Sequence, residues 1–153
     1  MRDLSKQFGI VSILFLAVMA VSPLKEYFRE WRQYQRKYNE YIQKLPQRFS
    51  PVKIALKQTW IPELDVIDRC TTCHVGMMEP ALKDADLPFA AHSPMYHHPE
   101  RFGCTPCHSG QGLATSVKTT FGFIKFWDKP MLSSKFIESS CGTCHKEGEV
   151  THA

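Results

Sequence analysis

Hydrophobic residues are concentrated in one stretch near the start of the chain, where residues 8–21 read FGIVSILFLAVMAV. As a helix this run is about 21 Å long, or about 26 Å if it continues to Leu24, somewhat short of a hydrocarbon core of roughly 30 Å. A secretory signal peptide cleaved after Val18-Met19-Ala20 is the alternative. The pattern favours an uncleaved transmembrane anchor over residues 1–24. Three aromatic residues follow as an interfacial belt: Tyr27, Phe28 and Trp31.

A second pattern follows Pro23, where apolar and aromatic residues recur at alternating spacings of three and four. The stripe consists of Leu24, Tyr27, Trp31, Tyr34, Tyr38, Tyr41 and Leu45. It predicts an amphipathic helix over residues 25–46, ended by Pro46. Such a stripe packs either on its own domain or on another subunit. We favour a seam for another subunit, because a short domain has little surface on which to bury a helix of this length.

Beyond residue 46, hydrophobic positions do not recur at a regular spacing. Residues 47–69 contain Pro51 and Pro62 and predict an extended connector, and residues 70–153 predict loops and short helices. The expected fold class is therefore mainly α with much irregular loop. A transmembrane helix continues into a long helix and then into a compact domain with little or no β-sheet.

Cysteine and histidine carry the chemical information in this chain, which has six Cys and seven His among 153 residues. All six Cys belong to three copies of one pattern. The copies are Cys70-Thr-Thr-Cys73-His74, Cys104-Thr-Pro-Cys107-His108 and Cys141-Gly-Thr-Cys144-His145. Cys-x-x-Cys-His is typical of a c-type haem attachment site. Its two thiols add to the two vinyl groups of one porphyrin, and the histidine that follows becomes the proximal iron ligand.

Two other interpretations of a Cys-x-x-Cys pair are half of a zinc site and a dithiol redox motif. A zinc ribbon needs no His directly after each pair, and dithiol motifs do not occur in threes outside a βαβ pattern. Three complete copies with no Cys left over therefore predict three haem c groups, with His74, His108 and His145 as iron ligands.

The spacing of the motifs limits the kind of domain that holds them. Only 76 residues separate Cys70 from His145 inclusive, which is too few for three separate apolar pockets. The haems are therefore expected to form much of the core and to lie close enough for electrons to pass between them.

The second axial ligands are less certain, and one segment supplies most of the candidates. His92, His97 and His98 cluster in AAHSPMYHHP, and adjacent His97 and His98 point in different directions on a regular backbone. Met131 is the best thioether candidate, ahead of Met77, Met78 and Met95, and His152 lies close to the end of the chain.

Composition and charge narrow the function classes. The chain is 43% hydrophobic and 22% charged, which excludes a disordered or multi-span membrane protein. A formal charge of +4, without a long basic tract, argues against a nucleic-acid partner. Six haem propionates would leave a mildly acidic holoprotein.

The motifs and their surroundings resemble the cassette of membrane-anchored trihaem and other multihaem cytochromes c. The resemblance covers roughly residues 60–145, from WIPEL through the first motif, HHPERFGC to Gln111-Gly112, and the third motif. It implies electron transfer by a subunit of a bacterial quinol-oxidising or bc-type respiratory membrane complex. Such cassettes often carry further His after the middle site, where this chain has Phe121 and Phe126. The third distal ligand therefore stays open between Met131 and a vacant iron.

The resemblance also implies a location and partners. Basic residues after the anchor outnumber those before it, which alone would place the domain in the cytoplasm. Covalent haem attachment normally occurs on the outer face of the bacterial inner membrane, so we expect a single-pass protein with a periplasmic haem domain. Expected partners are other subunits, bound through the N-terminal helix, and a periplasmic redox carrier or another cytochrome. The chain is not expected to be an enzyme by itself. The alternatives are a small haem reductase with one open iron and a structural or assembly subunit.

Overall fold

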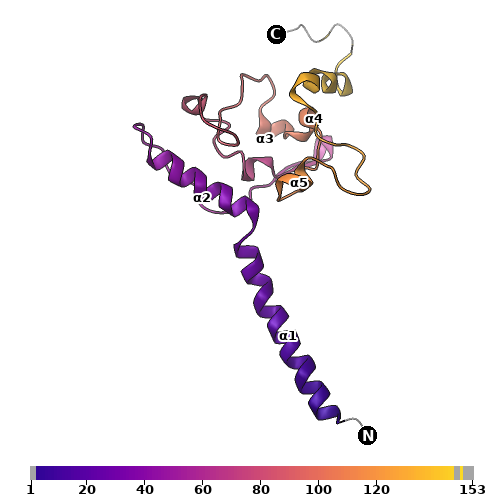
Figure 1. Ribbon diagram of the computed structural model, residues 1–153. Coiled ribbons are helices and arrows are strands. Elements are labelled where there is room, and N and C mark those ends of the chain that lie inside the picture. Colours follow the sequence, from indigo (N-terminus) through magenta and orange to yellow (C-terminus); the bar gives the residue numbers. More distant parts are fainter. Residues whose placement is uncertain (1–2, 147–148, 150–153) are drawn as a thin grey trace.

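The computed structural model describes residues 3–146 and residue 149. A long helix projects from a smaller, irregular domain (Figure 1). Regular structure is mostly helical, and the sheet found in the described residues is one hairpin of two short strands. The predicted mainly helical fold with much loop and little sheet is confirmed at this level.

The projecting helix α1 (Leu4–Tyr27) has 24 residues and is about 36 Å long. Its apolar side chains are exposed all round, and none of its residues is buried. This is the one helix of the described chain that is long and apolar enough to cross a membrane. A signal sequence near an N-terminus has the same length and composition. Pro23 lies inside the helix without ending it, so the predicted boundary at residue 24 is three residues too early.

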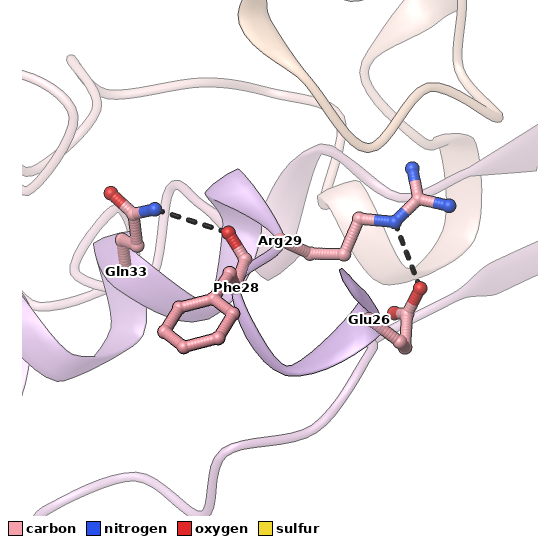
Figure 2. Close-up of polar contacts among 4 residues, drawn as sticks. All are labelled: Glu26, Phe28, Arg29 and Gln33. Carbon is pink, nitrogen blue, oxygen red and sulfur yellow. Dashed lines mark hydrogen bonds and ion pairs between the residues drawn. The ribbon is translucent and has the colours of Figure 1, made fainter. Parts of the chain in front are cut away.

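A break at Phe28 and Arg29 separates α1 from α2 (Glu30–Gln43). Arg29 has an extended backbone with φ −55° and ψ 142°. The predicted continuation of the anchor into a further helix is therefore found, with the break at Phe28 and Arg29 and not at Pro23. Figure 2 shows how side chains close the break: Arg29 Nε donates to Glu26 Oε2 at 2.8 Å, and Gln33 Nε2 donates to the Phe28 carbonyl at 3.1 Å. That carbonyl belongs to the end of α1 and has no partner within a helix.

Helix α2 packs on its own domain. Its buried residues are Trp31, Gln35, Tyr38 and Ile42. Tyr38 and Ile42 form the core cluster with Leu82, and Tyr41, Leu45 and Phe89 pack around it. The segment from Trp31 to Leu45 is thus covered by the same chain, and our preferred seam for another subunit is wrong for this segment. The stripe also missed Gln35 and Ile42, because a strict spacing of 3.5 residues drifts from the 3.6-residue period of a straight helix.

Two side-chain amides on α2 hold the connector in an extended course. Gln35 exchanges two hydrogen bonds with the backbone of Ala55, at 2.8 and 2.9 Å, and Asn39 does the same with Val52, at 2.9 and 2.8 Å. Gln35 Nε2 also donates to the Thr72 carbonyl at 2.9 Å. Because Gln35 is completely buried, these bonds satisfy an amide that has no access to water.

The second half of the predicted connector is a hairpin. Strand β1 (Thr59–Ile61), the short helix η1 (Pro62–Leu64) and strand β2 (Val66–Asp68) bring Trp60 opposite Ile67 in an antiparallel pair. The prediction of an extended connector over residues 47–69 is therefore wrong for residues 59–68. The alternation of Trp60, Ile61, Val66 and Ile67 was too short to indicate strands on its own.

The remaining elements are single turns joined by loops, except for a longer 3-10 segment near the C-terminus. They are η2 (Cys70–Thr72), η3 (Pro80–Leu82), α3 (Pro99–Phe102), α4 (Thr105–His108), α5 (Val117–Thr120) and η4 (Ser134–Thr143).

Replacing Gln35 by alanine leaves one N–H and two carbonyls buried without partners. We expect the free energy of unfolding to fall by about 2–3 kcal/mol. Chemical denaturation of the detergent-solubilised full chain, followed by far-UV circular dichroism, measures the change. Gln43→Ala, at an exposed position of the same helix, is the matched control and should change stability by less than about 0.5 kcal/mol. Equal losses of stability in the two variants would contradict a stabilising role for the Gln35 hydrogen bonds.

Candidate functional site

The three Cys-x-x-Cys-His motifs adopt the same backbone turn. In each motif the histidine N–H donates to the carbonyl of the first cysteine: His74 to Cys70 at 3.0 Å, His108 to Cys104 at 2.9 Å and His145 to Cys141 at 2.9 Å. Residues three and four apart share one side of such a turn. Each motif therefore presents two sulfurs and one imidazole in the same direction, as attachment to one flat ring requires. None of the six cysteines is joined to another by a disulfide bond.

A buried carboxylate joins the first motif to the second. Asp68 is 2% exposed and accepts three backbone N–H bonds, from Cys70 at 2.9 Å, Cys104 at 2.8 Å and Thr105 at 2.9 Å. Burial raises the pKa of the Asp68 carboxyl, but hydrogen bonds from Cys70, Cys104 and Thr105 outweigh burial and hold this pKa below its usual value. Asp68 is therefore ionised at neutral pH and fixes the start of two motifs at once.

A tight approach precedes the second motif. Gly103 has φ +71°, and a Cβ at this position would lie 3.0 Å from Val66 Cγ1 and 3.3 Å from Asp68 Oδ2. Only glycine fits here without strain, because both the backbone angle and the space next to the hairpin exclude a side chain. Gly103 thereby lets Cys104 reach the Asp68 carboxylate.

The first cysteines of these two motifs lie side by side. The side-chain ligand atoms of Asp68, Cys70 and Cys104 are all within 4.8 Å of one another. A hydrogen bond with Cys104, burial and the charge of Asp68 together raise the pKa of the Cys70 thiol far above its usual value. Burial raises the pKa of Cys73 to about 11. These thiols are protonated at neutral pH, which argues against a dithiol redox site, where a low thiol pKa is needed.

The same three groups also bear on the zinc alternative. A structural zinc site uses four ligands, commonly two Cys-x-x-Cys pairs that converge. Here the cluster takes only the first cysteine of each of two motifs. Cys73 and Cys107 are outside it, so neither motif contributes both of its sulfurs as a zinc ribbon would require.

Two of the motif histidines face a second histidine ring. The ring centroids of His92 and His108 are 6.0 Å apart with planes at 87°, and those of His97 and His145 are 5.8 Å apart with planes at 19°. Two imidazoles bound to opposite sides of one metal ion, through bonds of about 2 Å, have ring centroids about 6 Å apart. Both centroid distances are of this size, and each pair joins a motif to the segment in which we predicted distal ligands.

Among the described residues, no histidine ring is paired in this way with His74. The ring of His98 caps α3, where its Nδ1 accepts the Glu100 N–H at 3.3 Å. The Met131 side chain lies next to Gly110, just beyond the second motif. His152 lies outside the described residues. The distal candidates therefore differ in what lies near their rings. His92, whose Nδ1 lies 2.7 Å from the Ser93 carbonyl, and His97, whose ring also contacts Phe102, are each close to a motif histidine, whereas among the described residues His98 is not.

The surrounding protein sets the charge of two proximal candidates. Burial lowers the pKa of the half-buried His108, with a smaller contribution from His92. At His74, whose side chain is exposed at the surface, desolvation by the neighbouring protein and the nearby His108 and His92 lower the pKa in the same direction. Both imidazoles are therefore neutral at neutral pH, and the neutral ring is the form that binds a metal.

Sequence reasoning missed Asp68, the residue that positions two of the motifs. Its only signal was its place two residues before Cys70, and an aspartate near a motif is more often a solvated turn residue. The partners that give it a role are 36 and 37 residues away.

No protein-family model, curated protein or solved structure matches this chain.

Replacing Asp68 by asparagine removes the charge and one of the two acceptor oxygens. We expect the free energy of unfolding to fall by about 3 kcal/mol at neutral pH, because the amide nitrogen cannot accept the N–H bonds of Cys104 and Thr105. Denaturant titration measures the loss. Asp84→Asn, at an exposed position, is the control and should have an effect below about 0.5 kcal/mol.

The same variant tests the ionisation of Asp68. The folded-state pKa lies below the usual value, so the carboxylate contributes its full stabilisation above pH about 4 and loses it as the pH falls through the lower folded-state pKa. The stability difference between the wild-type chain and Asp68→Asn should therefore shrink between pH 4 and pH 2. A difference that stays constant over this range would contradict an ionised Asp68.

Proposed function

We propose that this chain is an electron-transfer protein of a membrane, carrying three covalently attached haem c groups. The observation that supports it most is the spacing of the two imidazole pairs, His92 with His108 and His97 with His145, across two separate attachment motifs. When bound, haem iron supplies a centre that accepts and releases one electron. A histidine pair holding each of two irons would favour transfer over bond-making there.

The chain's own residues would perform two tasks in this function. Six thioether bonds from the motif cysteines would fix the position and tilt of each ring. His74, His108 and His145 would bind the irons from one side, and His92 and His97 would bind two of them from the other. Bis-histidine ligation lowers the reduction potential relative to histidine with methionine.

Proximity of the three sites supports passage of electrons along the domain. The first and second motifs meet at Asp68, where Cys70 and Cys104 are neighbours. The segment that contains both His92 and His97 serves the second and third motifs, and η4, which contains the start of the third motif, contacts α4 of the second.

The small protein core supports prosthetic groups as the main filling of the domain. Only six apolar side chains are buried among the described residues: Trp31, Tyr38, Ile42, Ile61, Leu82 and Pro99. The accessible surface is 12141 Å², whereas a folded chain of 17.6 kDa has about 7,900 Å². Part of the excess is the exposed helix α1, and the rest belongs to a domain with few internal contacts of its own.

The exposed apolar surface of α1 supports a membrane anchor. The periplasmic side of a bacterial inner membrane is proposed for the haem domain because covalent haem attachment normally occurs there. Because α2 packs on its own domain, α1 is the part of the N-terminal region left for contact with other subunits. A place in a quinol-oxidising or bc-type respiratory complex, with a periplasmic carrier or another cytochrome as a further partner, follows from the resemblance of the motifs.

A haem reductase with one open iron is the second candidate function, and one observation favours it. Among the described residues His74 lacks the histidine ring partner that His108 and His145 have. An iron bound at the first motif would then have methionine, solvent or a substrate as its sixth ligand. A purely structural or assembly role has no observation of its own in its favour.

Intact-mass spectrometry of the chain purified from membranes tests the proposal directly. We expect the mass of the polypeptide plus three haems. Replacing Cys141 and Cys144 by serine should remove one haem and leave two. A chain with no added mass would overturn the proposal, and rapid reduction of the attached haems by quinol in a purified complex would extend it to a respiratory role.

The imidazole pairs predict which substitution opens an iron. In His97→Ala, the iron at the third motif loses its sixth ligand, so the reduced protein should bind carbon monoxide at one additional haem relative to the wild-type chain. Absorption spectra of the reduced protein with and without carbon monoxide measure this. His98→Ala is the matched control, since its ring caps α3, and should leave carbon monoxide binding unchanged. Equal effects of the two substitutions would contradict the assignment.

Wild-type binding of carbon monoxide separates the two candidate functions. Binding at one haem, abolished by loss of the first motif, would favour the reductase. No binding would favour a transfer protein with three six-coordinate irons.

A further inference from the structure

A cavity of about 410 Å³ lies at the joint between α1 and α2. Its wall is formed by the end of α1, the start of α2, the connector at Ala55 and Leu56, and two residues from later loops. Three of its side chains are guanidinium groups, those of Arg29, Arg32 and Arg69, and one is the carboxylate of Glu26. With three positive charges and one negative charge, the lining side chains carry a net positive charge, which favours an anion in the cavity.

The three guanidinium groups differ in how they are engaged. Arg29 Nε donates to Glu26, and Arg69 donates to Gln58 Oε1 and to the Leu113 carbonyl, each at 2.8 Å. Arg32 is stacked 4.4 Å above the Trp31 ring, and within the described chain its buried Nε has no hydrogen-bond partner. Arg32 therefore contributes to the cavity wall a guanidinium group for which no hydrogen-bond acceptor is found within the described chain, and an unpaired charged donor is costly.

The place of the cavity in the fold indicates where that anion comes from. It begins at Glu26, in the last turn of α1, directly after the apolar part of the helix. Tyr27 and Phe28 at the same level are 55% and 65% exposed, as aromatic residues at a membrane surface are. If α1 spans the membrane, the cavity lies in the polar headgroup layer.

We propose that this cavity binds the phosphate of an anionic phospholipid headgroup, with Arg32 as the main donor. A guanidinium group matches phosphate oxygens with two parallel N–H bonds. Glu26 lies on the wall and opposes the anion, while Arg29 partly neutralises it. A bound headgroup would contact both α1 and α2 and so fix the angle between the anchor and the domain. The inference rests on the proposed membrane location of α1, and not on haem binding.

Native mass spectrometry of the delipidated full chain in zwitterionic detergent, titrated with short-chain phosphatidylglycerol, tests the proposal. We expect one saturable lipid per chain, and about tenfold weaker binding in R32Q. R36Q removes the same charge one turn further along α2, from a side chain that stacks on Tyr27 outside the cavity, and should bind within about twofold of the wild-type chain. E26Q should bind more tightly, because it removes the opposing carboxylate.

Several outcomes would overturn the proposal. Equal weakening by R32Q and R36Q would indicate general surface charge, and saturation by inorganic phosphate as strong as by lipid would exclude a lipid source. Loss of a haem or a changed haem spectrum in R32Q would assign the cavity to a haem propionate. Should R32Q fail to fold, the E26Q increase alone decides. The haem count in the same mass spectra reports on the proposed electron transfer separately from the lipid.

Discussion

The ionised, buried carboxylate of Asp68 is the constraint on which the arrangement of the motifs depends. Its two oxygens receive backbone N–H groups from residues that are far apart in the sequence, and so it sets the first two attachment turns against each other. A charged acceptor suits this position, because a neutral one would leave at least one of three buried donors unpaired. Asp68 is the last residue of β2, so the hairpin determines where its carboxylate lies. Gly103, which has no side chain, allows the backbone of the second motif to approach that carboxylate.

The segments around Asp68 are held in place by hydrogen bonds from single polar side chains rather than by layers of packed apolar residues. Gln35 ties α2 to the backbone of the first motif at Thr72, and Thr72 in turn exchanges hydrogen bonds with Lys57 at 3.0 and 2.8 Å. The segment that holds His92 and His97 then spans the second and third motifs. In a domain with so few buried apolar side chains, directional bonds of this kind determine a unique arrangement that hydrophobic contact alone would leave loose.

The sequence was most informative where a local period or motif carries the structure. The apolar run predicted α1, and the stripe predicted a helix where α2 lies. It was least informative where a polar residue acts over a long distance. From the sequence alone, Gln35 would be placed on the solvent-exposed face of the helix. Its hydrogen-bond partners lie 20 and 37 residues further along the chain, and no local pattern indicates them. His92 and His97 were named as ligand candidates, but their pairing depends on loop paths that no periodicity encodes.

The break at Phe28 and Arg29 defines where the independently folded unit of this protein begins. The Gln35 and Asn39 amides bind α2 to the connector and to the first motif, whereas the α1 residues found next to the domain, Glu26 and Tyr27, belong to the last turn of that helix. A water-soluble version of the protein should therefore start just before Glu30. A truncation at Pro46, where the stripe ends, would instead remove α2. Leu82 and Phe89 would then lose the side chains that pack against them, and the backbone of the connector would lose its hydrogen bonds to α2.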